Sequence, residues 1–160
     1  MIAGVERDAE YMRQAIAISR RALKRGNRPY GAILIAADGR VLAEGQNTEQ
    51  SDRELTGHAE TNLLRDAYRT HDPATLAGAT LYASGEPCPM CAGTIFYSGI
   101  RRVVYGVSRG RVRALSPDAA DKPALNISCR DMLSKSTRAI EVIGPLLEDE
   151  AERVFAEAAG

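Results

Sequence analysis

The segment TLYASGEPCPMCAGTIFYSGIRRVVYGV, residues 80–107, indicates the fold class. Its first part, Thr80–Ser84, predicts a strand. Cys88–Ser98 then predicts a helix, which Gly99 can end as a C-terminal stop. The run Arg102–Val107 predicts a second strand. A helix placed between two strands in this way is typical of an α/β fold.

The sequence on either side predicts further elements of both kinds. Apolar side chains recur at helical spacing between Glu6 and Arg25, and Asp38-Gly39 is a turn signal between two β-prone runs. We expect helices over residues 6–25, 56–69 with Thr56 as cap, and 146–158, and strands over 30–36, 41–43 and 139–143. Residues 108–137 show no clear pattern, and only Arg130–Leu133 hints at a helix. The order of elements predicts an α/β sandwich with one mixed sheet.

The overall composition is that of an ordinary globular protein. The chain has 160 residues, 44% of them hydrophobic, and we expect a single domain over residues 1–160. Lys and Arg together number 21, as do Asp and Glu, so the net charge is zero, which argues against a nucleic-acid partner. Because the sequence shows no targeting segment and no apolar run of membrane-spanning length, we expect a cytoplasmic location and no membrane partner.

Two short motifs, His58-x-Glu60 and Cys88-x-x-Cys91, carry the chemistry. Two of the three cysteines stand in the second motif, which indicates metal binding in a reducing compartment. Cys88 and Cys91 are three residues apart, so on a helix they face the same way. With His58 they supply three zinc ligands and leave one position open for water, as in catalytic zinc sites. Glu60 follows His58 by two positions and should lie to one side of the metal, where it can move protons without binding zinc.

The cysteine motif has two other interpretations. Cys88-x-x-Cys91 after a strand and at the start of a helix can be a thiol redox pair, but the upstream His-x-Glu motif then has no role. A structural zinc site would need a fourth ligand, for which His71 and Cys129 are the candidates. Neither stands in a motif with ligand spacing, so we favour the catalytic zinc site.

These motifs and the sequence around them resemble the cytidine deaminase superfamily. The resemblance runs from the first helix through the strand at Arg102–Val107 and is closest to the branch of guanine deaminases, fungal-type cytosine deaminases and bacterial tRNA adenosine deaminases. Four motifs carry it: PYGA at 29–32, EGQN at 44–47, TGHAE at 56–60 and SGEPCPMCAG at 84–93. It implies a three-layer α/β/α sandwich with a five-stranded mixed sheet, Zn²⁺ as cofactor and, commonly, a homodimer.

The resemblance also implies roles for single residues. Three would bind zinc, namely His58, Cys88 and Cys91. Glu60 would be the catalytic proton shuttle. Asn47 would hydrogen-bond the substrate ring, because its amide offers both a donor and an acceptor, and the backbone N–H of Ala59 would lie near the substrate carbonyl. Phe96 and Tyr97 could pack against a base, although aromatic residues on such a helix more often belong to the core.

The implied reaction is hydrolytic removal of an amino group. The expected substrate is an amino-substituted nucleobase or related heterocycle, guanine- or cytosine-like, which becomes its keto form with release of ammonia. One alternative is a tRNA-specific adenosine deaminase that edits adenosine to inosine, and another is a non-catalytic zinc-stabilised binding protein. We expect specificity to depend on Ser108–Thr137, on the C-terminus and on a partner subunit. Within Ser108–Thr137, the side chains of Asp118, Asp121 and Arg130 could reach a base.

Two departures from the family pattern bear on the substrate. Tyr30 stands where related guanine deaminases often have Phe, and the chain ends at Gly160 without the tail that helps to close their site. Both weaken the expectation of guanine. Related tRNA adenosine deaminases have a more basic surface. Here Ser108–Arg113 contains three arginines, which could contact phosphate. Because the net charge is zero, we expect them instead to be solvated or to lie at the rim of the pocket.

Overall fold

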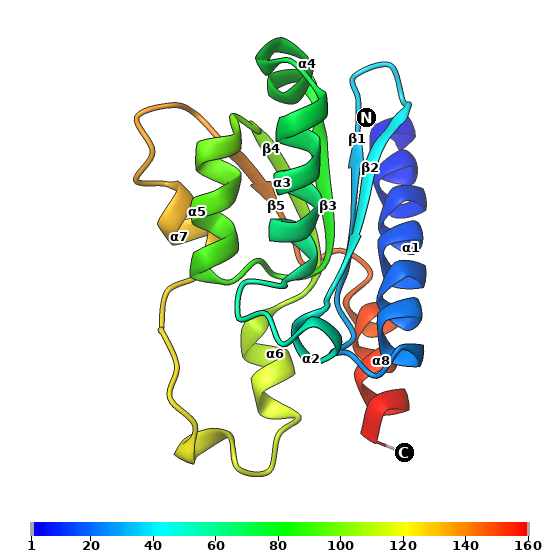
Figure 1. Ribbon diagram of the computed structural model, residues 1–160, viewed down its shortest axis with the longest axis vertical. Coiled ribbons are helices and arrows are strands. Elements are labelled where there is room, and N and C mark those ends of the chain that lie inside the picture. Colours follow the sequence, from blue (N-terminus) through cyan, green and yellow to red (C-terminus); the bar gives the residue numbers. More distant parts are fainter. Residues whose placement is uncertain (1, 160) are drawn as a thin grey trace.

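The described part of the chain, residues 2–159 of a computed structural model, is built around one mixed sheet (Figure 1). Its five strands are β1 (Gly31–Ile35), β2 (Val41–Gln46), β3 (Thr80–Gly85), β4 (Arg102–Val107) and β5 (Glu141–Ile143), in the spatial order β2-β1-β3-β4-β5. β1 runs antiparallel to both of its neighbours, whereas β3, β4 and β5 are parallel. The expected five-stranded mixed sheet is confirmed.

Helices cover both faces of the sheet and complete three layers. One face carries α1 (Ile2–Lys24) and α8 (Glu148–Ala159). The other carries α3 (Ala59–Thr70), α5 (Pro89–Ser98) and α7 (Cys129–Leu133) (Figure 1). The three-layer sandwich implied by the resemblance is therefore also confirmed.

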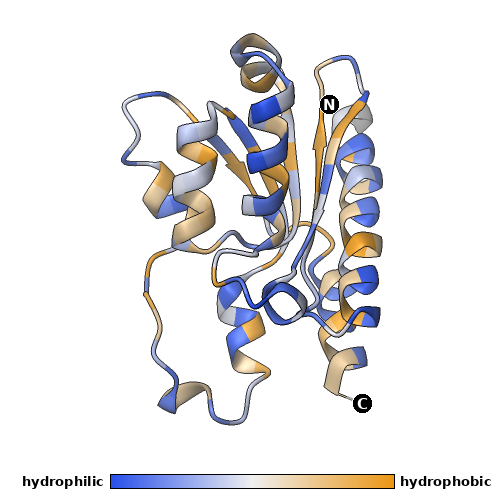
Figure 2. Ribbon diagram, viewed as in Figure 1, coloured by the Kyte–Doolittle hydropathy of each residue, from blue (hydrophilic) through white to orange (hydrophobic). Residues whose placement is uncertain are grey.

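The strand β1 shows why the sheet has a helix layer on each side. All five of its residues, GAILI, are buried, so it lacks the polar alternation of a half-exposed strand. Successive strand side chains point to opposite faces, so Leu34 packs in the core beneath α3 and α5 while Ile33 packs in the core beneath α1 and α8. In Figure 2 β1 is largely apolar, whereas α1 alternates between polar and apolar residues, as expected for a helix with one buried face.

The connection between β2 and α3 differs from its sequence prediction. α3 begins at Ala59 rather than at Thr56, and its N-cap is His58, which forms no side-chain capping bond. Thr56 does not cap the helix, because its backbone N–H and hydroxyl both donate to the Glu54 carboxylate within the loop. The connection between β2 and α3 also contains a short helix, α2 (Glu49–Asp52).

Residues 108–137, which show no clear pattern in the sequence, form short elements. α6 (Arg109–Ala114) follows β4, and a 3-10 turn spans Ala119–Asp121. The hint of a helix at 130–133 is confirmed by α7 (Cys129–Leu133).

Another short helix, α4 (Pro73–Gly78), lies between α3 and β3 and is capped by the Asp72 side chain. Across residues 2–159, no helix is long and apolar enough to cross a membrane.

Candidate metal centre and active site

Two helix N-termini bring the metal-binding side chains together. His58 is the N-cap of α3, Cys88 is the N-cap of α5, and Cys91 lies in the first turn of α5. Pro89 fits at the first position of α5, where a helix has no backbone hydrogen bond to lose. α5 follows the carboxyl end of β3, a common place for ligand sites in open α/β sheets.

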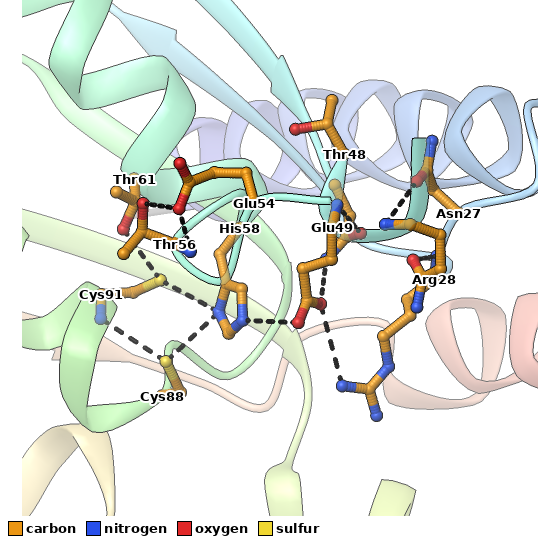
Figure 3. A network of polar contacts seen from close by, with 12 residues as sticks. Asn27, Arg28, Thr48, Glu49, Glu54, Thr56, His58, Thr61, Cys88 and Cys91 are labelled. Carbon is orange, nitrogen blue, oxygen red and sulfur yellow. Dashed lines mark hydrogen bonds and ion pairs between the residues drawn. The ribbon is translucent and has the colours of Figure 1, made fainter. Parts of the chain in front are cut away.

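The spacing of the three ligand atoms fits a zinc ion. His58 Nδ1 lies 3.4 Å from Cys88 Sγ and 3.6 Å from Cys91 Sγ, and all three ligand atoms lie within 4.8 Å of one another (Figure 3). Zinc–sulfur bonds of about 2.3 Å and zinc–nitrogen bonds of about 2.0–2.1 Å, at tetrahedral angles, would separate a sulfur from a nitrogen by about 3.6 Å. Because the observed separations match, these side chains can hold zinc with little movement.

The two thiols differ in pKa in a way that favours a bound cation. Hydrogen bonding with Cys91, assisted by His58, lowers the pKa of Cys88 to about 4. The pKa of Cys91 is raised, because its hydrogen bond to Cys88 and its burial favour the neutral thiol. Two adjacent thiolates repel each other, and a divalent cation between them removes that repulsion.

A four-ligand structural zinc site does not fit this arrangement. Within residues 2–159, the cluster with metal-ligand spacing contains His58, Cys88 and Cys91 and no fourth member. His71 instead lies at the opposite end of α3, where its Nε2 is 3.3 Å from the Leu42 carbonyl oxygen. Three protein ligands leave a coordination position open, as catalysis requires.

Glu60 lies beside the three ligands and is 5% exposed. Its Oε2 accepts a hydrogen bond from the Cys91 thiol at 3.5 Å. Burial raises the pKa of Glu60 to about 7. The Glu60 carboxylate therefore lies next to the metal-binding cluster but is not one of its members. This agrees with the sequence prediction, because residues two apart on a helix do not share a face.

A cavity of about 1040 Å³ gives access to this site. His58, Glu60 and Cys88 line it near the metal-binding cluster, and much of the remaining wall comes from the segment 109–128. Small-molecule pockets commonly enclose about 300–1,000 Å³. The cavity can therefore hold a heterocycle together with a substituent.

The sequence of this site matches that of known enzymes. Residues 5–107 match the family model for the cytidine and deoxycytidylate deaminase zinc-binding region. The chain belongs to this family. This deaminase is accordingly a zinc-dependent hydrolase that acts on C–N bonds.

Relatives of the deaminase differ in their substrates. A probable cytosine deaminase of Schizosaccharomyces pombe is 39% identical over 146 residues, which are 91% of this chain and 88% of the relative. A tRNA-specific adenosine deaminase of Bacillus subtilis is 36% identical over 99 residues, 62% of this chain and 61% of the relative. The solved structure of a guanine deaminase from Nitrosomonas europaea is 26% identical with a TM-score of 0.76, covering 94% of this chain and 83% of its own.

The two expected substrate contacts of the deaminase lie close to the metal-binding cluster. Asn47 is 1% exposed and lines the cavity. Its Nδ2 donates to Glu49 Oε2 at 2.7 Å and its Oδ1 accepts from the Glu49 backbone N–H at 3.1 Å. Each group keeps a further hydrogen-bonding capacity, since the amide has two N–H groups and its oxygen two lone pairs. Ala59 is buried at the first position of α3, where backbone N–H groups have no partner within the helix.

Three polar residues near the deaminase site were not predicted from the sequence as functional residues. Glu49 lies 3.5 Å from His58, and the Thr61 hydroxyl lies 3.3 Å from Cys91 Sγ. Glu86 accepts the backbone N–H groups of Arg109 and Cys129, both at 2.9 Å. Position within the SGEPCPMCAG motif could have drawn attention to Glu86, but Glu49 lies in a polar stretch with no distinguishing signal.

Three residues expected to reach a base do not line the cavity. Arg130 donates to the backbone carbonyl groups of Val142 and Gly144, which direct its guanidinium group towards β5. Asp118 accepts from Ser116 and pairs with Lys122 at the surface, and Asp121 is exposed at the end of the 3-10 turn. In this arrangement the three side chains are therefore not part of the cavity wall.

Of the two aromatic residues and three arginines that the sequence suggested as substrate or phosphate contacts, some line the cavity and others lie at the surface. Phe96 is half-buried with Arg138 over its ring, while Tyr97 is 81% exposed, so neither aromatic packs into the cavity. Arg111 pairs with acidic residues of α8. Arg109 and Arg113 line the cavity, as expected for residues at its rim.

Proposed function

We propose that this deaminase converts an amino-substituted free nucleobase, cytosine- or guanine-like, to its keto form and releases ammonia. The observation that carries the proposal is the buried carboxylate of Glu60 beside three ligand atoms at the end of an accessible cavity. The near full-length similarity to a probable cytosine deaminase and the zero net charge support a small substrate.

In the proposed reaction, His58, Cys88 and Cys91 hold the zinc ion. When bound, zinc supplies the Lewis acidity that makes water a nucleophile near neutral pH. Glu60 accepts a proton from the attacking water and returns one proton to the departing amino group, which leaves as ammonia. Water and the amino-heterocycle thus yield the keto product and ammonia. Because Glu60 is buried, bulk water does not compete for its proton.

Two further groups are proposed to orient the ring. Asn47 hydrogen-bonds the ring edge with its remaining donor and acceptor, and the Ala59 backbone N–H donates to the substrate carbonyl.

The proposed function is tested by measuring ammonia release by the zinc-loaded protein from cytosine, guanine, adenine, their nucleosides and aminotriazines. Release from a free base supports the proposal, whereas inactivity towards the whole panel contradicts it.

A second candidate is adenosine-to-inosine editing of tRNA. One observation favours it: among the described residues, the guanidinium groups of Arg109 and Arg113 in the cavity wall donate only to backbone carbonyl oxygens and form no ion pair with a carboxylate. Inosine formation in tRNA with all free bases inert would replace the first proposal. Activity should then fall steeply as salt rises, because phosphate contacts release bound counterions.

The proposal also includes a cytoplasmic homodimer. Leu55 and Tyr97 are 82% and 81% exposed and offer apolar surface for a second copy. The free thiols of the metal site favour a reducing compartment. Sedimentation equilibrium at micromolar concentration measures the mass, and a monomer there would remove the homodimer from the proposal.

A further inference from the structure

Glu49 occupies the centre of a polar network between the metal site and the cavity wall. It is the first residue of α2, and its side chain is 19% exposed. Figure 3 shows the His58 ring between the two cysteine sulfurs on one side and Glu49 on the other, with Arg28 beyond Glu49. The carboxylate therefore faces a metal-binding imidazole without belonging to the ligand cluster.

The contact with His58 bears on the protonation of the ring. His58 Nδ1 faces both sulfurs, so Nδ1 is the nitrogen available to the metal. A neutral imidazole that binds a metal through Nδ1 must carry its proton on Nε2. His58 Nε2 lies 3.5 Å from Glu49 Oε1, and an ionised carboxylate can only accept. Glu49 thus favours the tautomer that leaves Nδ1 free for zinc.

The other carboxylate oxygen of Glu49 holds Asn47. Asn47 Nδ2 donates to Glu49 Oε2 at 2.7 Å, and the Glu49 backbone N–H donates to Asn47 Oδ1 at 3.1 Å. These two bonds distinguish the donor end of the amide from its acceptor end. The orientation in which Asn47 meets a substrate is therefore set by the residue that also contacts His58.

Arg28 gives Glu49 a positive neighbour. Its Nη1 lies 3.8 Å from Glu49 Oε2, and its guanidinium group lies 5.9 Å from the centre of the Tyr30 ring. Figure 3 shows that this contact reaches the Glu49 side chain from the side away from His58, so the carboxylate is held between the two residues.

We propose that Glu49 is a positioning residue that couples zinc binding to substrate orientation. One carboxylate holds His58 in the tautomer that presents Nδ1 and holds the amide of Asn47 in one orientation. Carboxylates behind a metal-bound histidine fix its ring and strengthen its binding in other zinc proteins. The Asn47 half of the inference rests on the proposed function, whereas the His58 half does not.

The first test measures zinc affinity by competition with a chromophoric chelator under reducing conditions. Glu49→Gln keeps the size of the side chain but offers one acceptor oxygen to two donors. We expect it to bind zinc about 10–100-fold more weakly than the unaltered protein. Asp52→Asn is the matched control, because Asp52 ends the same helix and accepts only from Ser51 among the described side chains. The control should bind zinc normally, and normal binding by Glu49→Gln would overturn the proposal.

Two additional readouts separate positioning from a loss of folding. The absorption spectrum of Co²⁺ in the site should change in Glu49→Gln and remain unchanged in Asp52→Asn. If circular dichroism shows that metal-free Glu49→Gln is unfolded, the zinc titration is repeated with Glu49→Asp, which keeps the charge and shortens its reach. Unaltered zinc affinity in that variant would equally overturn the proposal.

The substrate half is tested at saturating zinc. Asn47→Ala should raise KM while leaving zinc affinity unchanged, whereas Glu49→Gln should affect both. If Asn47→Ala weakens zinc as strongly as Glu49→Gln, the loop as a whole supports the site and the proposal fails. If the unaltered protein deaminates nothing in the substrate panel, the proposed function fails, while the zinc titration still decides the role of Glu49.

Discussion

At the scale of single residues, the site depends on the different environments of two neighbours on one helix. His58 caps α3 and faces the thiols, while Glu60, two positions later, is directed into a buried position beside them. Because residues two apart on a helix do not share a face, one can bind the metal while the other remains free to move protons. A buried carboxylate without full pairing also costs stability, which is typical of a group retained for function.

Glu60→Gln tests that division of roles. We expect the deamination rate to fall by about 10²–10⁴, because a general acid–base is removed, with zinc content unchanged. The melting temperature should stay equal or rise, since an amide is less costly to bury than a carboxylate. Steady-state kinetics, metal analysis and calorimetry provide the three measurements. Full activity, or loss of the metal, would contradict the assignment.

At the scale of elements, close approach of β2 and α3 positions the site. A Cβ atom added to Gly45 would lie 2.2 Å from the Ala59 carbonyl oxygen and 2.7 Å from Leu63 Cβ. Any larger residue must therefore push apart the strand before Asn47 and the helix that begins beside His58. The glycine of the EGQN motif is required by this packing rather than by a turn.

Gly45→Ala should accordingly destabilise the protein by about 1–3 kcal/mol, the usual cost of overpacking, and weaken zinc binding as α3 shifts. Urea denaturation and zinc competition measure the two effects. Gly78→Ala serves as the control, because its added Cβ would meet only Ala37 Cβ at an ordinary 3.7 Å. Equal stability of the two variants would refute the packing explanation.

Glu86 connects the ends of the segment that forms much of the cavity wall. One oxygen accepts the Arg109 N–H and the other accepts the Cys129 N–H, twenty residues further along the chain. Glu86→Ala should raise KM and speed amide hydrogen exchange in residues 109–128, because both anchors are lost together. Glu44→Gln, which removes a surface ion pair with Arg21, should change neither. Unaltered exchange in Glu86→Ala would show that the segment is held by other contacts.

At the scale of the whole molecule, a cluster of polar and charged side chains holds helix α1, on the face of the sheet opposite the metal site, against the strands. Arg102 of β4 donates to both oxygens of Asp8 in α1, at 3.0 and 2.7 Å, and the Tyr82 hydroxyl donates to Asp8 at 2.6 Å. Burial alone would raise the pKa of Asp8, but the hydrogen bonds from Arg102 and Tyr82 outweigh it and hold the pKa below its usual 3.8. The cluster joins α1 to the neighbouring strands β3 and β4.

The lowered pKa of Asp8 gives stability a defined pH dependence. Its contribution is fully present above the unfolded-state pKa, near pH 4, and is lost as pH falls through the lower folded-state pKa. Asp8→Asn should destabilise the protein at pH 7 by about 1–3 kcal/mol and flatten the acid limb of the stability curve. Urea denaturation from pH 7 to pH 3 measures both. An unchanged acid limb would exclude Asp8 as its source.

The parts that local sequence encodes could be predicted without the structure. Strand positions follow from short β-prone runs, and the metal ligands follow from residue chemistry at fixed spacing on helix termini. Thr56 was misplaced as a cap because its partner, the Glu54 carboxylate, competes from within the loop. Residues 108–137 could not be assigned, since short elements carry too little periodicity.

The sequence by itself therefore indicated the reaction class, through its resemblance to known deaminases, and the three candidate zinc ligands, because their residue types stand in two short motifs. Only the tertiary structure decided which polar groups support the site. Glu49 meets His58, and Glu86 meets Cys129, across connections of nine and forty-three residues along the chain. Such contacts depend on how the layers pack, and no local pattern records them.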